Sequence, residues 1–126
     1  MRGCVALRPA LIYGPGDTSK SYGPAGFAHE ETVTLWGEGD ERREFVFVLD
    51  VAEIVARLVT SNYTGPLNVV TGKARTFREA AAIAGAKITT KPRSKPKVDH
   101  GFDNRRLTGL FPDFRFRSLE EGMSAL

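Results

Sequence analysis

The run Phe-Val-Phe-Val-Leu at residues 45–49 constrains the fold of this chain more than any other stretch. A strand with one face in water alternates apolar and polar side chains, because neighbouring residues point to opposite faces. Every position in this run is apolar, so neither face is suited to water. The run therefore predicts a strand that is buried on both faces.

Three helix starts carry the same capping pattern, in which a glutamate follows a capping residue by three positions. Each side chain can then bond a backbone N–H that the first turn leaves without a partner. In the first helix, apolar side chains recur at helical spacing over residues 51–59. The second helix is expected to stop at Gly85, and the third to be short. The three pairs are Asp50 and Glu53, Thr76 and Glu79, and Ser118 and Glu121.

Strand candidates fill the gaps around these helices. Residues 36–40 are expected to form a turn, and residues 91–97 a loop, because prolines interrupt helices and central strands. Alternating strands and helices predict the α/β class (α+β-like), with a partial mixed sheet and about three helices. The further strand candidates are residues 5–12, which we expect to be buried, 32–36, 67–70 and 87–90.

Length and composition narrow the class of protein. The chain has 126 residues, which fits one domain, and no apolar run approaches the roughly 18 residues of a membrane span. The single cysteine, Cys4, cannot form an internal disulfide, and with only two histidines we expect no metal site. These features predict a soluble, cytoplasmic protein without a membrane partner.

The net charge of +3 is unevenly distributed along the chain. Residues 1–72 carry a net charge of −3, whereas residues 73–117 hold twelve basic and four acidic side chains, a net charge of +8. This leaves an alternative function open: a small non-catalytic basic module that binds nucleic acid or an acidic partner. Residues 87–97 contain no aromatic side chain and no nucleic-acid signature, so nucleic acid is the less favoured partner.

Four segments, in this order, resemble the C-terminal half of an extended short-chain dehydrogenase/reductase in the NAD-dependent epimerase/dehydratase family. The resemblance covers nearly the whole chain, and the Trp-Gly to Arg-Glu-Phe segment is most similar to nucleotide-sugar reductases and epimerases. The segments are residues 8–17 (RPALIYGPGD), 36–52 (WGEGDERREFVFVLDVA), 67–72 (LNVVTG) and 118–122 (SLEEG).

Two family motifs do not occur in this chain. Family members hold the dinucleotide with a Gly-x-x-Gly-x-x-Gly turn and use a Tyr-x-x-x-Lys pair for proton transfer, and neither spacing exists here. The resemblance therefore implies a chain truncated at its N-terminal side. Residues 1–17 would be the last strand or strands of a Rossmann-type domain, and residues 18–126 the substrate-binding domain. We expect no catalytic residue in this chain, no bound dinucleotide, and no turnover by this chain alone.

The resemblance also implies which residues contact ligands. Pro9 and Ala10 would lie beside the nicotinamide of NAD or NADP in the full-length parent, and Leu11 would contact the substrate. Arg43 would bind the substrate diphosphate, since a guanidinium fork suits phosphate oxygens. Trp36 would line the nucleotide pocket, and a hinge or core role is the alternative for it. For Arg43 the alternative is an exposed arginine near a turn. The expected function is a substrate-binding fragment of a nucleotide-sugar epimerase, dehydratase or reductase, with the nucleotide-diphosphate sugar bound weakly or not at all.

Other residues of interest have plainer explanations. Asp50 could be a catalytic carboxylate, but its position favours helix capping. Tyr13 lacks the partner lysine, which favours packing in a turn. The family often places a second diphosphate-binding cation where Lys95, Lys97 and Arg105 stand, and the sequence does not choose among them. A strand at residues 5–12 without neighbours would leave an apolar edge, so we expect a homo-oligomer.

Overall fold

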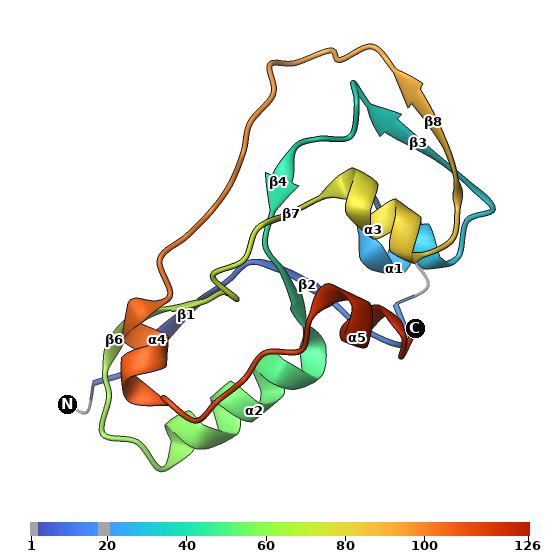
Figure 1. Cartoon of the computed structure of the whole chain (residues 1–126). Coiled ribbons are helices and arrows are strands. Elements are labelled where there is room, and N and C mark those ends of the chain that lie inside the picture. The colour runs from blue at the N-terminus through green and yellow to red at the C-terminus, as the bar shows by residue number, and fades with distance from the viewer. Residues whose placement is uncertain (1–2, 18–20) are drawn as a thin grey trace.

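The computed structural model describes residues 3–17 and 21–126, which form a mixed α/β fold (Figure 1). Their helices are α1 (Pro24–Ala28), α2 (Val48–Val59), α3 (Phe77–Ile83), α4 (Arg105–Leu110) and α5 (Leu119–Met123). Their strands are β1 (Val5–Pro9), β2 (Leu11–Tyr13), β3 (Thr32–Trp36), β4 (Arg42–Arg43), β5 (Phe45–Phe47), β6 (Gly65–Val69), β7 (Arg75–Thr76) and β8 (Lys87–Lys91). The α/β class is confirmed, and α1 and α4 are two helices beyond the expected three.

The described strands pair two by two. β1 with β6, β2 with β5 and β3 with β8 are parallel pairs, whereas β4 and β7 are antiparallel, so both strand directions occur, divided among four two-stranded sheets. In Figure 1, β1, β6, α2 and α4 lie together at one end of the molecule, and β3, β8, α1 and α3 lie at the other. β4, β5 and β7 run between the two ends, and the chain returns from β8 to α4 as a long loop.

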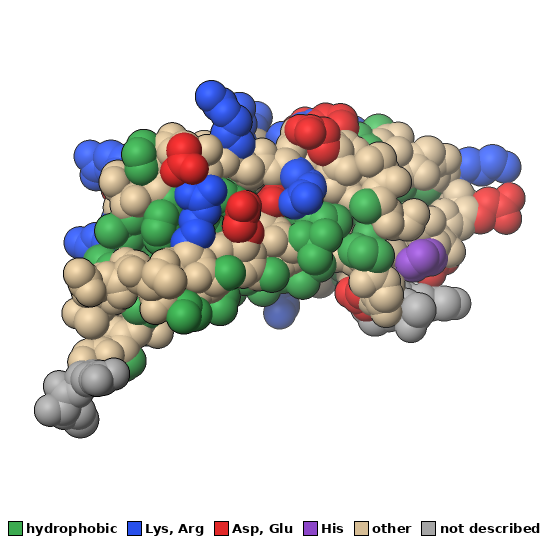
Figure 2. Space-filling model, turned by 90° about the horizontal axis from the view of Figure 1, so that it is seen from below, with side chains coloured by type: hydrophobic (Ala, Val, Ile, Leu, Met, Phe, Trp, Pro, Cys, Tyr) green, Lys and Arg blue, Asp and Glu red, His purple; other side chains and the backbone are tan. Residues whose placement is uncertain are grey.

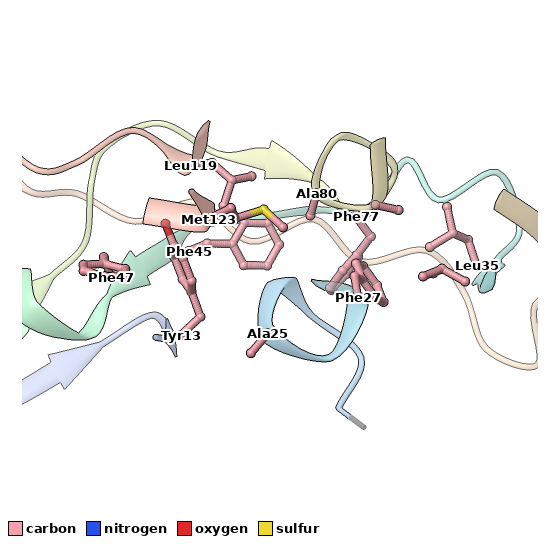
Figure 3. Close-up of a cluster of buried hydrophobic side chains, with 12 residues drawn as sticks. Tyr13, Ala25, Phe27, Leu35, Phe45, Phe47, Phe77, Ala80, Leu119 and Met123 are labelled. Carbon is pink, nitrogen blue, oxygen red and sulfur yellow. The ribbon is translucent and has the colours of Figure 1, made fainter. Parts of the chain in front are cut away.

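Two apolar cores correspond to the two ends. The first gathers Phe27, Phe77 and Met123 from α1, α3 and α5 (Figure 3), and the second gathers side chains of α2, β6 and α4. β5 contributes to both, because Phe45 and Phe47 face the first core while Val46 faces the second. All three are at most 4% exposed. The prediction of a strand buried on both faces is therefore confirmed for β5.

The predicted strand at residues 45–49 is too long, because α2 begins directly after Phe47. Val48 and Leu49 belong to the helix and are exposed. Asp50 is consequently in the first turn and is not the cap, so its predicted capping role is wrong. The capping boxes at Thr76 and Ser118 are both confirmed.

The predicted strand at residues 5–12 divides at Ala10. The Ala10 N–H donates to the Val69 carbonyl oxygen (3.3 Å) and the Leu11 N–H to that of Glu44 (3.2 Å), so the chain changes its pairing partner from β6 to β5. Most side chains here are exposed, including Leu11 and Ile12, which corrects the expectation of a buried strand. No described helix is long and apolar enough to cross a membrane.

Candidate functional site

A cavity of about 440 Å³ lies where the turn after β3, strand β4 and the loop after β8 meet. Gly37 and Gly39 reverse the chain between the two strands with φ values of 57° and 70°, a left-handed conformation that favours glycine. We call this hollow the arginine cavity. Its lining residues are Trp36, Glu41, Arg43, Arg93, Ser94, Lys95, Pro96 and Val98.

Arg43 is anchored at the wall of the arginine cavity. Its Nη1 donates to the carbonyl oxygens of Arg42 (2.8 Å) and Val98, and its Nη2 to Glu41 Oε2 (3.3 Å). The guanidinium carbon lies 5.5 Å from the centre of the Phe77 ring, a cation–π arrangement. These contacts fix the guanidinium, whereas the neighbouring Arg42 is exposed.

Arg93 reaches the same carboxylate from the loop after β8. Its Nη1 donates to Glu41 Oε1 (2.5 Å) and its Nη2 to Asp40 Oδ1 (3.3 Å). Burial raises the pKa of Glu41. The Arg93 hydrogen bond, the Val98 N–H and the charges of Arg93 and Arg43 lower it, and together they outweigh burial. The net pKa is below the usual glutamate value, so Glu41 is ionised at neutral pH.

Trp36 forms an aromatic part of the wall. The Lys91 ammonium lies 3.7 Å from the centre of its ring, and the Trp36 backbone N–H donates to the Tyr22 hydroxyl (3.2 Å). With Lys95, the cavity brings together three cations, one carboxylate and one indole ring. Such a set can bind a ligand that carries several negative charges beside a flat apolar group.

The predicted ligand residues are not all brought together. Trp36 and Arg43 line the arginine cavity, whereas Leu11 lines a separate hollow of about 250 Å³ beside α1. Pro9 ends β1 with an exposed side chain, and Ala10 packs against the second core. These three residues therefore form no common site with Arg43 among the described residues.

Of the three alternative cations, Lys95 lines the arginine cavity. Lys97 forms ion pairs with Asp40 (3.2 Å) and Asp99, and Arg105 with Asp103 (2.7 Å). Arg93 and Glu41 also belong to this site, although no sequence motif singles them out. Arg93 stands in the basic, proline-bounded loop that was predicted, and this was the only signal for it.

Tyr13 and Asp50 have structural surroundings. Burial, followed by the nearby Asp50 charge, raises the pKa of Tyr13 to about 12, so its hydroxyl stays protonated at neutral pH. Asp50 is buried and accepts hydrogen bonds from the backbone N–H of Arg117 (2.8 Å) and from its Nη1 (2.5 Å). This pair connects α2 to the segment before α5.

Five of the twelve basic side chains at residues 73–117 form ion pairs with acidic side chains of the described chain, Arg105 with Asp103 among them. Arg93 and Lys97 pair with residues 40–41, and Arg117 pairs with Asp50. Arg75 binds Glu79 and Glu120. These five side chains serve internal contacts, and Arg93 among them lines the arginine cavity.

Comparisons with known proteins identify the family and the fold. The sequence model of the NAD dependent epimerase/dehydratase family matches residues 2–71. A comparison with curated proteins finds no match. Among solved structures, the fold is similar to the UDP-glucose 4-epimerase of Thermus thermophilus in complex with NAD, with a TM-score of 0.71 and 29% identity. That alignment covers 96% of this chain and 44% of the other.

Two more solved structures show the same relation. The UDP-glucose 4-epimerase of Thermotoga maritima with UDP-glucose gives a TM-score of 0.75 at 25% identity, over 96% of this chain and 43% of that chain. The ADP-L-glycero-D-manno-heptose-6-epimerase of Helicobacter pylori gives 0.78 at 22% identity, over 95% and 42%. This chain thus spans less than half the length of these structures.

Proposed function

Because the chain belongs to the NAD-dependent epimerase/dehydratase family, we propose that it forms the substrate-binding part of a nucleotide-sugar epimerase, dehydratase or reductase. One observation carries the proposal. Arg43 and Trp36, which the family resemblance assigns to the diphosphate and the nucleotide, line one cavity together with Arg93 and Lys95. The Thermotoga maritima relative contains UDP-glucose, a ligand of this chemistry.

In the proposed binding mode, the arginine cavity receives the diphosphate. Arg43 and Arg93 supply guanidinium N–H donors, which suit phosphate oxygens and some of which bond Glu41 in this structure, and Lys95 adds a point charge. The indole of Trp36 forms the wall for the nucleoside. Residues 18–126 would constitute the substrate-binding domain, and residues 1–17 would belong to the dinucleotide-binding side.

The family implies NAD or NADP. β5 runs into α2, and β7 into α3, without an intervening residue, so these two described junctions have no room for the glycine-rich turn that holds a dinucleotide diphosphate. Pro9, Ala10 and Leu11 remain proposals for the nicotinamide and sugar side of a larger site. We propose that this chain alone binds no dinucleotide and catalyses no reaction.

Calorimetry with UDP-glucose tests the proposal. Arg43→Ala should weaken binding about tenfold or more, since a hydrogen bond to a charged group contributes roughly 1.5–3 kcal/mol. Arg42→Ala is the matched control, because it removes the same charge from the neighbouring exposed position, and it should leave the affinity within about twofold. Equal affinity of the wild type and Arg43→Ala would reject the assignment of Arg43 to the diphosphate. Micromolar binding of NAD to this chain would overturn the separate proposal that it binds no dinucleotide.

A further inference from the structure

Glu41 occupies the position between the two arginines of the cavity. Its Oε1 accepts from Arg93 Nη1 (2.5 Å), and its Oε2 accepts from Arg43 Nη2 (3.3 Å) and from the Val98 N–H (3.2 Å). The side chain is 14% exposed. A carboxylate of this chain therefore already uses donors that a bound phosphate would need.

Glu41 also sets the charge of the cavity. The lining side chains include three cations and one carboxylate, which leaves an excess of two positive charges. The diphosphate of a nucleotide sugar is a diester with two negative charges. A free nucleoside diphosphate carries a third charge on its terminal phosphate at neutral pH, because the second pKa of such a phosphate is about 6. Bringing that third charge beside an ionised carboxylate is unfavourable in a partly buried site.

We propose that Glu41 is a specificity-determining residue that makes the arginine cavity favour the diphosphate diester of a nucleotide sugar over a free nucleoside diphosphate. This inference rests on the proposed function. It assigns a role to a carboxylate that would otherwise only oppose an anionic ligand. Asp40 is the nearest comparable acid, but it is half exposed, lies outside the lining, and shares its charge between Arg93 and Lys97.

The test compares the affinities of UDP and UDP-glucose for the wild type, Glu41→Gln and Asp40→Asn. Glutamine keeps the size of the side chain and removes the charge. We expect Glu41→Gln to tighten UDP binding about fivefold more than UDP-glucose binding, the effect of one partly exposed charge pair. Asp40→Asn should change the ratio of the two affinities less than about twofold. Thermal unfolding of each variant verifies that it is folded, and Glu41→Ala should shift the ratio in the same direction.

Two results overturn the inference in different ways. If Glu41→Gln weakens both ligands equally, or leaves their ratio unchanged, Glu41 only orients the arginines. The proposed function then still stands, provided that UDP-glucose binds the wild type and depends on Arg43. If neither ligand binds the wild type or Glu41→Gln, the proposed function fails and this inference fails with it.

Discussion

Tyr13 directs its hydroxyl into the first core, toward α5 (Figure 3), and Gly122 is the residue that makes room for it. A Cβ at position 122 would lie 1.9 Å from Tyr13 Oη, well inside van der Waals contact. The tyrosine is 3% exposed and packs edge-on against Phe47, so it cannot move aside freely. The fit between the two residues fixes how α5 packs against the end of β2.

Gly122→Ala should therefore destabilise the protein by about 1–3 kcal/mol, the usual effect of overpacking a core. Gly109→Ala is the control, because that glycine is in α4 and faces open space. There the helix-favouring alanine should be neutral or stabilising by up to ~1 kcal/mol. The measurement is the urea midpoint of each variant, and a Gly122→Ala midpoint no lower than that of Gly109→Ala would contradict this packing.

At the residue scale, the sequence predicted those site residues that lie in a recognisable local motif. Arg43 follows an aromatic-glycine turn and precedes the buried strand, and both features are visible in the chain order. Arg93 and Glu41 are 52 positions apart and meet through tertiary packing. No local spacing connects them, so the ion pair that shapes the cavity could not be predicted.

Among the elements, α5 is held to β7 by one bidentate ion pair. Arg75 Nη1 and Nη2 donate to the two carboxylate oxygens of Glu120 at 3.1 and 2.5 Å, while its Nε donates to Glu79. The Arg75 hydrogen bonds lower the pKa of Glu120 from 4.5 to about 2. A depressed carboxylate pKa stabilises the folded state above about pH 4.5, and this contribution is lost as the pH falls toward 2.

Glu120→Gln should therefore lower the free energy of unfolding at pH 7 and leave it nearly unchanged at pH 2. The Glu120 side chain is 54% exposed, so solvent screening limits the loss at pH 7 to about 1 kcal/mol or less. Urea unfolding at pH 7, 4 and 2 measures the difference between the two proteins. A difference that stays constant over this range would show that the ion pair does not stabilise the fold.

Element prediction succeeded where the signal was local. The capping boxes of α3 and α5 involve residues three positions apart, and both formed as predicted. The same pattern at Asp50 failed, because β5 continues straight into α2 and the carboxylate binds Arg117, 67 positions away. α1 and α4 were missed, since helices of five and six residues have too few turns to show an apolar period.

For the whole molecule, apolar side chains remain exposed on β1, β2 and α2. Figure 2 views the molecule from the α2 side and shows hydrophobic side chains gathered along this face. Exposed apolar surface of this kind favours association with another polypeptide. The exposed large apolar residues of these three elements are Leu7, Leu11, Ile12, Val48, Leu49, Val55 and Val59.

We therefore expect the chain to form a dimer or larger homo-oligomer in solution. Light scattering measures the molar mass directly, and replacing Val55 and Val59 together by glutamate should shift the protein toward the monomer. These positions are on the exposed side of α2, so the fold should tolerate the charges. A monomeric wild type at high micromolar concentration would contradict the expectation.

The central claim, that the arginine cavity binds a nucleotide-diphosphate sugar, has a direct spectroscopic test. The chain has a single tryptophan, Trp36, and its indole lies in the cavity wall. In an NMR titration with UDP-glucose, the Trp36 indole N–H and the Arg43 and Arg93 side-chain resonances should all shift. The three shifts should follow the same binding curve and saturate at the same ligand concentration. Saturable binding that leaves these three signals in place, or no binding at millimolar ligand, would contradict the claim.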